Sequence, residues 1–287
     1  MTQRTWFITG VNSGFGRLMT EQLLECGERV AGTVRDFAPM ADLQARYGEQ
    51  LWLAELDVTD TAAIRDVVGA AFAELGRIDA VVSNAGYGLF GAAEEATDDQ
   101  LLHQLNTNLI GSIQLVRAVL PHLRQQGGGR IIQLSTMGGQ ATFPGGSLYH
   151  AGKWGIEGFI ESVGQEVAVF NIGCTLVEPG GARTDFRYRS SRLTPKLDAY
   201  DVSPASMARR MIEEGSSVPP GDPARMVAAM IATVDQHPAP KRLALGGDAY
   251  TVMHKQLSDR LAALEAQQEL AFSTDFPQAP PRHSLTT

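Results

Sequence analysis

The sequence is poor in cysteine, and this scarcity alone excludes two kinds of structure. Its 287 residues include two cysteines, Cys26 and Cys174, which lie far apart in the chain. No Cys-x-x-Cys pair and no cluster of cysteine and histidine surrounds either of them, so the sequence predicts neither a disulfide framework nor a zinc site. We expect two small thiols that fill space in a protein of the reducing cytoplasm, and we expect no bound metal.

Long apolar runs and blocks of like charge are also absent. No stretch approaches the ~18 uninterrupted apolar residues that a membrane helix requires. The first residues lack the charged and apolar segments of a secretory leader. Lys and Arg total 24 against 32 Asp and Glu, and the resulting net charge of −8 is spread along the chain. Because duplex nucleic-acid binders usually carry the opposite sign, we expect neither nucleic acid nor membrane insertion among its partners.

Short runs rich in Val, Ile and Leu alternate with longer amphipathic stretches along most of the chain. This alternation is typical of parallel strands that crossover helices bury on both faces. It predicts an α/β fold in one domain, residues 1–272, with a seven-stranded, mostly parallel sheet. The predicted strands are Thr5 to Thr9, Arg29 to Val34, Leu51 to Leu56, Ile78 to Ser83, Arg130 to Ser135, Cys174 to Val177 and Leu243 to Leu245. The predicted helices are Arg17 to Cys26, Thr61 to Leu75, Asp98 to Arg124, Ser147 to Phe170 and Asp222 to Asp235.

Two segments lack this regularity. No clear period is visible between Thr184 and Gly221, and an irregular stretch of this length inside a compact domain is usually a lid or a binding segment. We therefore predict a substrate lid over about 185–221. From Ser273 onward the chain contains Pro277, Pro280 and Pro281, so we expect residues 273–287 to form a flexible tail.

A glycine-rich turn, Thr9-Gly10-Val11-Asn12-Ser13-Gly14-Phe15-Gly16, joins the first predicted strand to the first predicted helix. The diphosphate of a dinucleotide would meet a helix N-terminus at this point. Gly10 permits the tight turn, Gly14 lets the backbone approach phosphate, and Gly16 lets the helix pack on the strand. The spacing differs from Gly-x-Gly-x-x-Gly and resembles that of the short-chain dehydrogenase/reductase family, in its branch of about 250 residues. This resemblance implies a single Rossmann-type, doubly wound domain with helices on both faces of the sheet.

Tyr149-His150-Ala151-Gly152-Lys153 places a phenol and an ammonium one turn apart on one face of a helix. A nearby cation favours the phenolate and would lower the pKa of Tyr149 towards the working range. With Asn108 and Ser135 upstream, the order Asn, Ser, Tyr, Lys resembles the catalytic tetrad of the family. The resemblance implies that Tyr149 donates and accepts the proton and that Ser135 hydrogen-bonds the substrate oxygen. It also implies that Lys153 holds the nicotinamide ribose and that Asn108 supports a water linking Lys153 to solvent.

The second predicted strand ends in Thr33-Val34-Arg35-Asp36. Val34 stands where NAD-binding folds place an acid for the ribose hydroxyl, and Arg35 follows it. Resemblance to NADP-preferring members implies that Arg35 binds the 2′-phosphate, with help from Asn12 or Ser13. A shift of one residue would instead put Asp36 near the ribose, which leaves NAD(H) as the alternative to the favoured NADP(H).

Three further loops at strand ends resemble cofactor contacts of the family. Asp57 and Val58 follow the third predicted strand, where the adenine is held, and Ser83-Asn84-Ala85-Gly86 resembles its Asn-Asn-Ala-Gly element with Ser83 replacing the first Asn. Pro179-Gly180 with Thr184 resembles the turn beneath the nicotinamide. The full set of residues that the resemblance assigns to the cofactor is Gly10, Asn12, Ser13, Gly14, Phe15, Gly16, Arg35, Asp57, Val58, Asn84, Ala85, Gly86, Tyr149, Lys153, Pro179, Gly180 and Thr184.

The resemblance predicts an oxidoreductase, a ketoreductase, that moves a hydride between NADP(H) and a ketone or secondary alcohol. A likeness of Gly32 to Asp36 to hydroxysteroid and retinol dehydrogenases favours a bulky, apolar substrate, as do the residues expected to line its pocket: Tyr87, Met137, Phe143, Leu148 and Phe186. Two alternatives stay open, a nicotinamide-binding sensor or scaffold of the same fold and an epimerase or dehydratase that holds NAD tightly. The family packs the helices predicted at Asp98 to Arg124 and Ser147 to Phe170 between subunits, which implies a homodimer or homotetramer.

Overall fold

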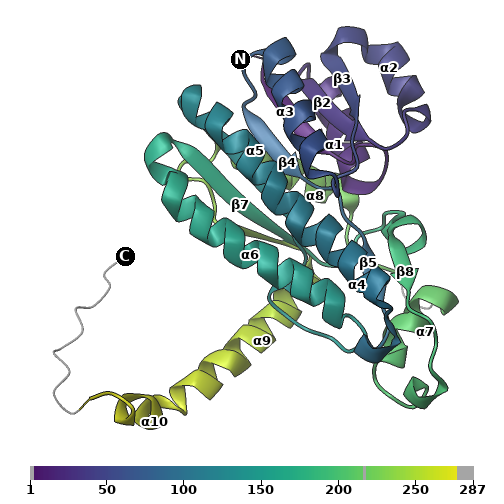
Figure 1. Ribbon diagram of the computed structural model, residues 1–287, viewed down its shortest axis with the longest axis vertical. Helices are drawn as coiled ribbons and strands as arrows, with labels where there is room; N and C mark the ends of the chain where they lie inside the picture. Colours follow the sequence, from purple (N-terminus) through teal and green to yellow (C-terminus); the bar gives the residue numbers. More distant parts are fainter. Residues whose placement is uncertain (1–2, 216–217, 277–287) are drawn as a thin grey trace.

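The computed structural model describes residues 3–215 and 218–276. Its central sheet has seven strands, all parallel, in the order β3-β2-β1-β4-β6-β7-β9 (Figure 1). The predicted α/β fold is therefore confirmed, and each predicted strand is present with ends that differ by at most a few residues. The strands are β1 (Thr5–Thr9), β2 (Arg29–Val34), β3 (Leu51–Glu55), β4 (Ala80–Ser83), β6 (Gly129–Leu134), β7 (Ile172–Pro179) and β9 (Arg242–Leu245).

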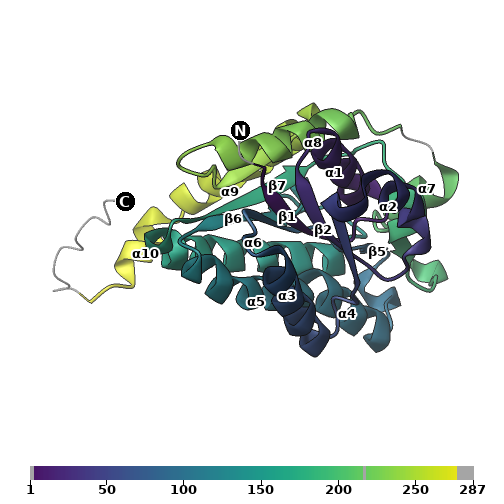
Figure 2. The same ribbon diagram turned by 90° about the horizontal axis from the view of Figure 1, so that it is seen from above.

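Helices cover both faces of the sheet, as Figure 2 shows from above. One face carries α3 (Thr61–Leu75), α4 (Asp98–Leu105), α5 (Gly111–Gln125) and α6 (Ser147–Val167). The opposite face carries α1 (Gly14–Glu25), α8 (Pro223–Ala232) and α9 (Gly247–Glu265), and the short helix α2 (Ala41–Tyr47) follows β2. Because both faces are covered, the strands have no solvent face and read as continuous apolar runs.

The core consists of two main layers, one on each side of the sheet, and β1 shows how a single strand supplies both. Trp6 and Ile8 pack with α1 and α8, whereas Phe7 between them packs with α3, α5 and α6. All three side chains are fully buried. Successive side chains of a strand point to opposite faces, so an unbroken apolar segment is what a doubly covered sheet requires.

The strand order creates a crevice at one edge of the molecule. The chain leaves β1 towards β2 on one side, while β4 lies on the other side of β1. Connections that diverge in this way leave an opening at the carboxyl ends of the two strands, where ligands bind in open α/β sheets. The glycine-rich turn follows β1 and Asn84 follows β4, so both lie at this opening.

The helix predicted from Asp98 to Arg124 is two helices, α4 and α5, joined by a π-helical turn at Asn106–Ile110. Thr97 caps α4 by accepting a hydrogen bond from the Gln100 amide at 3.2 Å. At the start of α5, a Cβ on Gly111 would lie 2.5 Å from the Val58 carbonyl oxygen. The backbones therefore approach so closely that only glycine fits there, and the π turn brings Asn106–Ile110 against the loop after β3.

The predicted lid contains more regular structure than expected. The strand β8 (Ser191–Leu193) pairs in parallel with β5 (Gly88–Phe90), and the helix α7 (Ser206–Glu214) follows. These elements are short, and their amphipathic pattern is too brief to stand out in the sequence, which explains why an irregular segment was predicted. β8 and α7 lie beside α4 at one end of the molecule (Figure 1), and the role of this segment as a lid stays a prediction.

A buried carboxylate, that of Glu95, links the segment from β8 to α7 to the loop that follows β5. Glu95, which follows β5, accepts hydrogen bonds from the Thr194 hydroxyl at 2.9 Å and from the Leu197 amide at 3.0 Å. Arg209 of α7 lies 3.4 Å from the same carboxylate. Burial alone would raise the pKa of Glu95, but these hydrogen bonds, with that from the Ala92 amide and the charge of Arg209, hold it below its ordinary value. The lid is thus anchored by an ionised group at neutral pH.

The sequence analysis predicted no helix after the last strand and a flexible tail from residue 273. Beyond β9 the chain forms α9 and then α10 (Gln268–Ser273), which extend away from the sheet in Figure 1. The tail predicted for 273–287 is described only as far as residue 276. Residues 277–287, which contain the three prolines, lie outside the described part, so that prediction stays a prediction.

Candidate active site

A cavity of about 810 Å³ lies along the carboxyl ends of β1, β2, β4, β6 and β7. This is the crevice that the strand order creates, and its volume lies within the usual range for ligand sites. Most residues predicted to contact a cofactor line it, although they come from separate parts of the chain. They are Gly10, Asn12, Ser13, Gly14, Phe15, Arg35, Asp57, Val58, Asn84, Ala85, Gly86, Tyr149, Lys153, Pro179, Gly180 and Thr184.

The glycine-rich turn brings the start of α1 to this cavity. The Gly10 and Val11 amides donate to the Thr33 carbonyl oxygen, whereas the Gly14 and Phe15 amides have no hydrogen-bond partner among the described residues. Gly10 and Gly14 have φ of 73° and 55°, which side chains other than glycine rarely adopt. Gly16 does not line the cavity: a Cβ there would lie 2.2 Å from the Gly10 carbonyl oxygen, so its role is packing. Ser13 makes no side-chain cap on α1, and the first turn of α1 has no acidic residue. The amides at this helix N-terminus therefore suit a phosphate group.

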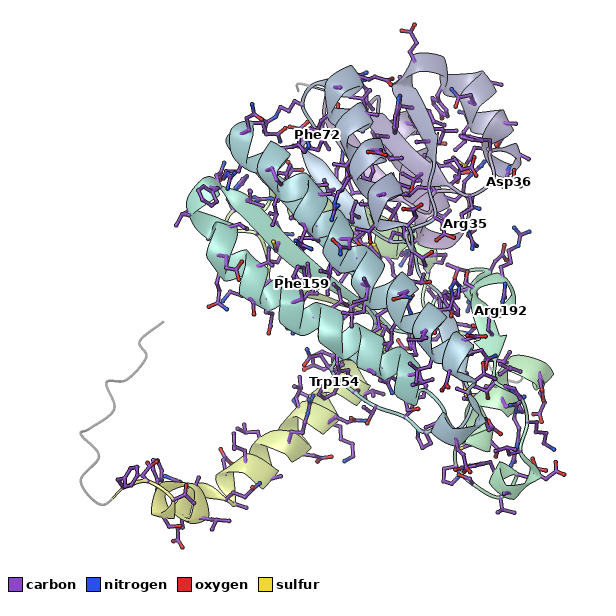
Figure 3. The ribbon with its side chains drawn as sticks, in the orientation of Figure 1. Arg35, Asp36, Phe72, Trp154, Phe159 and Arg192 are labelled. Carbon is purple, nitrogen blue, oxygen red and sulfur yellow. The ribbon has the colours of Figure 1, made fainter. Side chains whose placement is uncertain are left out.

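Arg35 and Asp36 diverge at the end of β2, as Figure 3 shows. Arg35 lines the cavity and has no hydrogen bond or ion pair among the described residues. Asp36 does not line the cavity, and its carboxylate accepts a hydrogen bond from the Ala38 amide at 3.0 Å. A cation thus faces the cavity at this point, while the competing carboxylate is occupied by its own loop.

The loop after β4 ties two strands together at the floor of the cavity. The Asn84 side-chain amide donates to the carbonyl oxygens of Thr9 and Gly10 at 2.9 and 3.0 Å. The backbone amide of Asn84 donates to the Thr9 hydroxyl at 3.0 Å. On the neighbouring β3 end, hydrogen bonds from Thr59 hold the pKa of Asp57 below its ordinary value. The cavity floor is therefore rigid and ready to receive a ligand.

Thr107 adds an observation that points to a ligand in this cavity. Its hydroxyl is buried, lines the cavity and has no hydrogen-bond partner among the described residues. A buried polar group without a partner is costly, so such groups are normally satisfied by protein, water or ligand. Together with the free helix N-terminus of α1, Thr107 indicates that the residues present fit a polar dinucleotide.

Tyr149 and Lys153 lie one turn apart on α6, with exposed fractions of 8% and 6%. The Lys153 Nζ atom lies 5.8 Å from the centre of the Tyr149 ring and donates to the Leu134 carbonyl oxygen at 2.9 Å. Burial raises the pKa of Tyr149 to about 12 and lowers that of Lys153 to about 8. The direction for Tyr149 is opposite to the sequence-based expectation, because desolvation of the phenolate outweighs the hydrogen bonding that lowers this pKa. At neutral pH the phenol therefore keeps its proton.

Two hydroxyls follow β6, and they point to different partners. Ser135, the predicted partner of the substrate, donates its hydrogen bond to the carboxylate of Glu157 on α6. Thr136 is instead the side chain whose hydrogen bonding lowers the pKa of Tyr149 against the effect of burial. Both residues line the cavity, but of the two only Thr136 influences the pKa of the phenol. The Thr136 hydroxyl also donates a hydrogen bond to the Pro179 carbonyl oxygen at 3.4 Å.

Asn108 lies in the π-helical turn and is 1% exposed. Its side chain holds both polar backbone atoms of Tyr87: Oδ1 accepts from the amide at 3.0 Å, and Nδ2 donates to the carbonyl oxygen at 2.6 Å. Asn108 does not line the cavity. The structure therefore places it behind the site, where it fixes the loop that follows Gly86.

The residues predicted for the substrate pocket divide into two groups. Tyr87 and Phe186 line the cavity, whereas Met137, Phe143 and Leu148 do not. Met137 packs beneath α9 against a small cluster that includes Met253. The ring of Phe143 packs edge-on against His150, 4.3 Å between centres. These residues are close to Tyr149 in sequence, but they are not part of the cavity wall.

Other residues at this end of the cavity were not among the residues predicted for the site. They come from α4, β5 and the lid: Leu89, Asp99, Gln100, His103, Arg189, Ser190, Arg192 and Leu193. Thr136 could have been identified, because it is a second hydroxyl at the same strand end. The lining from α4 and β8 depends on tertiary placement, and Figure 3 shows Arg192 on the same side of the molecule as Arg35.

None of the helices in residues 3–215 and 218–276 combines the length and the apolar character needed to cross a membrane. In the same part of the chain, no three side chains of His, Cys, Asp or Glu gather as metal ligands would.

Known proteins with similar sequences are dehydrogenases and other oxidoreductases. The family model for short chain dehydrogenases matches residues 4–193. Oxidoreductase BOA17 of Botryotinia fuckeliana is 34% identical over 273 residues, covering 94% of this chain and 99% of that protein. A 3-ketodihydrosphingosine reductase of Bacteroides thetaiotaomicron is 36% identical over 195 residues, covering 67% and 70%. Human retinol dehydrogenase 8 is 33% identical over 190 residues, covering 64% and 60%.

Solved structures extend the likeness to the whole chain. A short-chain dehydrogenase from Streptomyces avermitilis superposes with a TM-score of 0.89 at 36% identity, covering 96% of this chain and 99% of that one. The closed form of a serine dehydrogenase complexed with NADP⁺ superposes with a TM-score of 0.70 at 26% identity, covering 84% and 94%.

Proposed function

Because the chain belongs to the short-chain dehydrogenase/reductase family and is an NAD(P)-dependent oxidoreductase, we propose that it transfers a hydride between NADP(H) and a ketone or secondary alcohol. The observation that carries the proposal is the buried pair of Tyr149 and Lys153 at the end of the cavity that the glycine-rich turn opens. The cofactor supplies the hydride when bound. The residues of this chain place the substrate and move the proton at the Tyr149 oxygen.

Reduction is the direction for which the site is prepared. The raised pKa of Tyr149 keeps a proton on the phenol at neutral pH, and a carbonyl that accepts a hydride needs a proton on its oxygen. Thr136 is the hydroxyl placed to hydrogen-bond the same oxygen, because it faces the phenol while Ser135 is engaged by Glu157. We therefore assign the substrate-binding hydroxyl to Thr136 and a supporting role to Ser135.

Lys153 and Asn108 complete the proposed site. The Lys153 ammonium reaches the cavity and would hold the nicotinamide ribose, with its Nζ atom fixed by the Leu134 carbonyl oxygen. Asn108 holds Tyr87 on the cavity wall rather than contacting a ligand itself. Pro179, Gly180 and Thr184 line the cavity beside Thr136 and would form the surface beneath the nicotinamide.

A bulky, apolar substrate is favoured by the wall and by two relatives. Tyr87 and Phe186 form part of the cavity wall together with Leu89 and Leu193. The names of two relatives, a 3-ketodihydrosphingosine reductase and a retinol dehydrogenase, refer to molecules with long apolar parts. The direct test is a screen of NADPH and NADH oxidation over ketones from small to steroid-sized. We expect turnover with large apolar ketones, and turnover confined to small or charged ones would contradict this substrate class.

NADP(H) is preferred over NAD(H) in this proposal because Arg35 faces the cavity and Asp36 does not. We expect Arg35→Ala to raise the Kd for NADPH about tenfold or more, since hydrogen bonds to charged groups contribute about 1.5–3 kcal/mol. The Kd for NADH should change little. Fluorescence titration with both cofactors measures the difference. Arg46→Ala, on the exposed surface of α2, is the matched control, and equal losses for both cofactors would show that Arg35 does not contact the phosphate.

We extend the proposal to assembly and location. On the side of the sheet that α5 and α6 cover, Trp154 of α6 is 40% exposed and Ile110, just before α5, is 41% exposed. Figure 3 shows Trp154 and Phe159 along α6. A homodimer or homotetramer that buries this face fits the isologous contacts typical of soluble enzymes. Cys26 and Cys174 are both free, and Cys26 is exposed, which supports the cytoplasm as the compartment.

A further inference from the structure

A carboxylate lies directly behind the proposed active site without lining the cavity. Glu157 follows Lys153 by one turn on α6, so it shares a helix face with both Lys153 and Tyr149. It is 2% exposed. A charged group at this depth needs several partners to stay ionised, and the identity of those partners connects Glu157 to the reaction.

The partners of Glu157 lie at both ends of one short loop. Ser135, at the start of the loop, donates its hydroxyl hydrogen to Oε1 of Glu157. Gln140, at the end of the loop, donates from its side-chain amide to Oε2 at 2.7 Å. Thr136 lies between these two contacts. The carboxylate therefore holds the two ends of the segment that presents Thr136 to Tyr149.

The loop wraps so closely around the carboxylate that it has little freedom to move. A Cβ on Gly139 would lie 1.7 Å from Glu157 Oε1 and 2.6 Å from Ser135 Oγ. Only glycine can occupy this position while both groups stay in place. The residues Met137–Gly139 form a single 3-10 turn, so a shift of the carboxylate would be transmitted along the loop to Thr136.

Arg242 of β9 supplies the balancing charge. Its guanidinium lies 2.6 Å from Glu157, forms a second close pair with Glu178 and contacts Glu161 at 2.9 Å. Burial and the neighbouring Glu157 raise the pKa of Glu178 to about 7. The charge of Glu157 also raises the pKa of Lys153 against the effect of burial, which lowers it. Glu157 thus interacts with two cations, the Lys153 ammonium of the proposed active site and the Arg242 guanidinium of β9.

We propose that Glu157 is a positioning residue for the reaction, because its carboxylate fixes the loop from Ser135 to Gln140 so that Thr136 faces Tyr149 and supports the charge of Lys153. This inference rests on the proposed function. It assigns to Ser135 the task of orienting the loop rather than contacting substrate. It also gives a reason for the hydrogen bond from the Ser135 hydroxyl to Glu157.

The test compares Glu157→Gln with Glu161→Gln. Glu161 is the matched control because it lies one turn further along α6 and contacts the same Arg242, but its side chain is 48% exposed. We expect Glu157→Gln to lower kcat about tenfold or more, since small misplacements of catalytic groups are costly. The Kd for NADPH should stay within about threefold of the parent, and Glu161→Gln should keep the parent's kcat. The kcat is expressed per NADPH-binding site, so that misfolded protein does not enter the comparison.

A second variant keeps the inference testable if Glu157→Gln fails to fold. Gln140→Ala removes the partner at the far end of the loop and leaves the Arg242 pair intact, and we expect it to lower kcat severalfold at unchanged NADPH affinity. Parental kcat in both Glu157→Gln and Gln140→Ala, or an equal loss in Glu161→Gln, would overturn the positioning role. If Tyr149→Phe loses turnover in the same experiment, the proposed function stands whatever the result for Glu157. If Tyr149→Phe keeps it, the proposed function fails first.

Discussion

Tyr149→Phe is expected to lower turnover by ~10² or more while NADPH binds as in the parent. The substitution removes the phenol oxygen that carries the proton and nothing else. The ring is 8% exposed and packs against Phe90 at 5.5 Å between ring centres, so a phenylalanine fills the same space without leaving a cavity. The measurement is ketone-dependent NADPH oxidation, with NADPH affinity determined separately by fluorescence.

The control for this variant is Tyr250→Phe. Tyr250 lies on α9 and is 64% exposed, so removal of its hydroxyl should leave turnover unchanged. A Tyr149→Phe enzyme within a few-fold of the parent would refute the proton-transfer role. It would also return attention to a nicotinamide-binding scaffold, which needs no proton donor. Tightly bound NAD in the purified protein, without net cofactor turnover, would favour an epimerase or dehydratase instead.

The second large effect is expected at the hydroxyl that faces the phenol. Thr136→Ala should lower kcat by ~10², which is the usual cost of removing one hydrogen-bond donor from the oxygen that develops charge. Ser135→Ala should cost only a few-fold, because its hydroxyl contacts Glu157 and acts through the loop. Thr136→Ser keeps a hydroxyl at the same position and should retain most of the activity. Steady-state kinetics on the three variants measures the ranking.

The reverse ranking would overturn this assignment. If Ser135→Ala loses ~10² and Thr136→Ala keeps parental turnover, the hydroxyl of Ser135 must leave Glu157 and bind the substrate. Measurement of thermal stability separates the two explanations, because loss of a buried hydrogen bond lowers Tm in either case but changes kcat only where the hydroxyl serves the reaction. The comparison therefore tests a chemical role rather than folding.

The strands and the helices that pack on them were predictable because burial on both faces leaves a strong pattern. The five residues of β1 are all buried, and β2 and β4 are nearly as apolar. Helix ends were also marked in the sequence, as at Gly76, which follows α3 with φ of 75°. The lid and α9 were predicted poorly, since half-exposed or solvent-facing elements carry only a weak pattern.

The candidate site was predictable at positions where one residue type is required. Gly10 and Gly14 need φ values open to glycine, and Tyr149 and Lys153 need one turn of helix between them. By contrast, Ser135 and Thr136 are adjacent hydroxyls of similar chemistry. Nothing in the sequence says which one faces the phenol, because that depends on a carboxylate that comes from α6, 22 residues further along the chain.

By itself, the sequence determined the α/β class, the parallel sheet, the dinucleotide turn and the Tyr149–Lys153 pair, because each depends on local spacing or on burial that repeats along the chain. Only the tertiary structure decided that Arg35 rather than Asp36 faces the cavity and that Met137, Phe143 and Leu148 do not. It also decided that the Ser135 hydroxyl donates to Glu157 and that burial raises the pKa of Tyr149. These properties depend on which surface of an element faces a distant neighbour and on how much water that neighbour removes, and neither is encoded within a few residues of sequence.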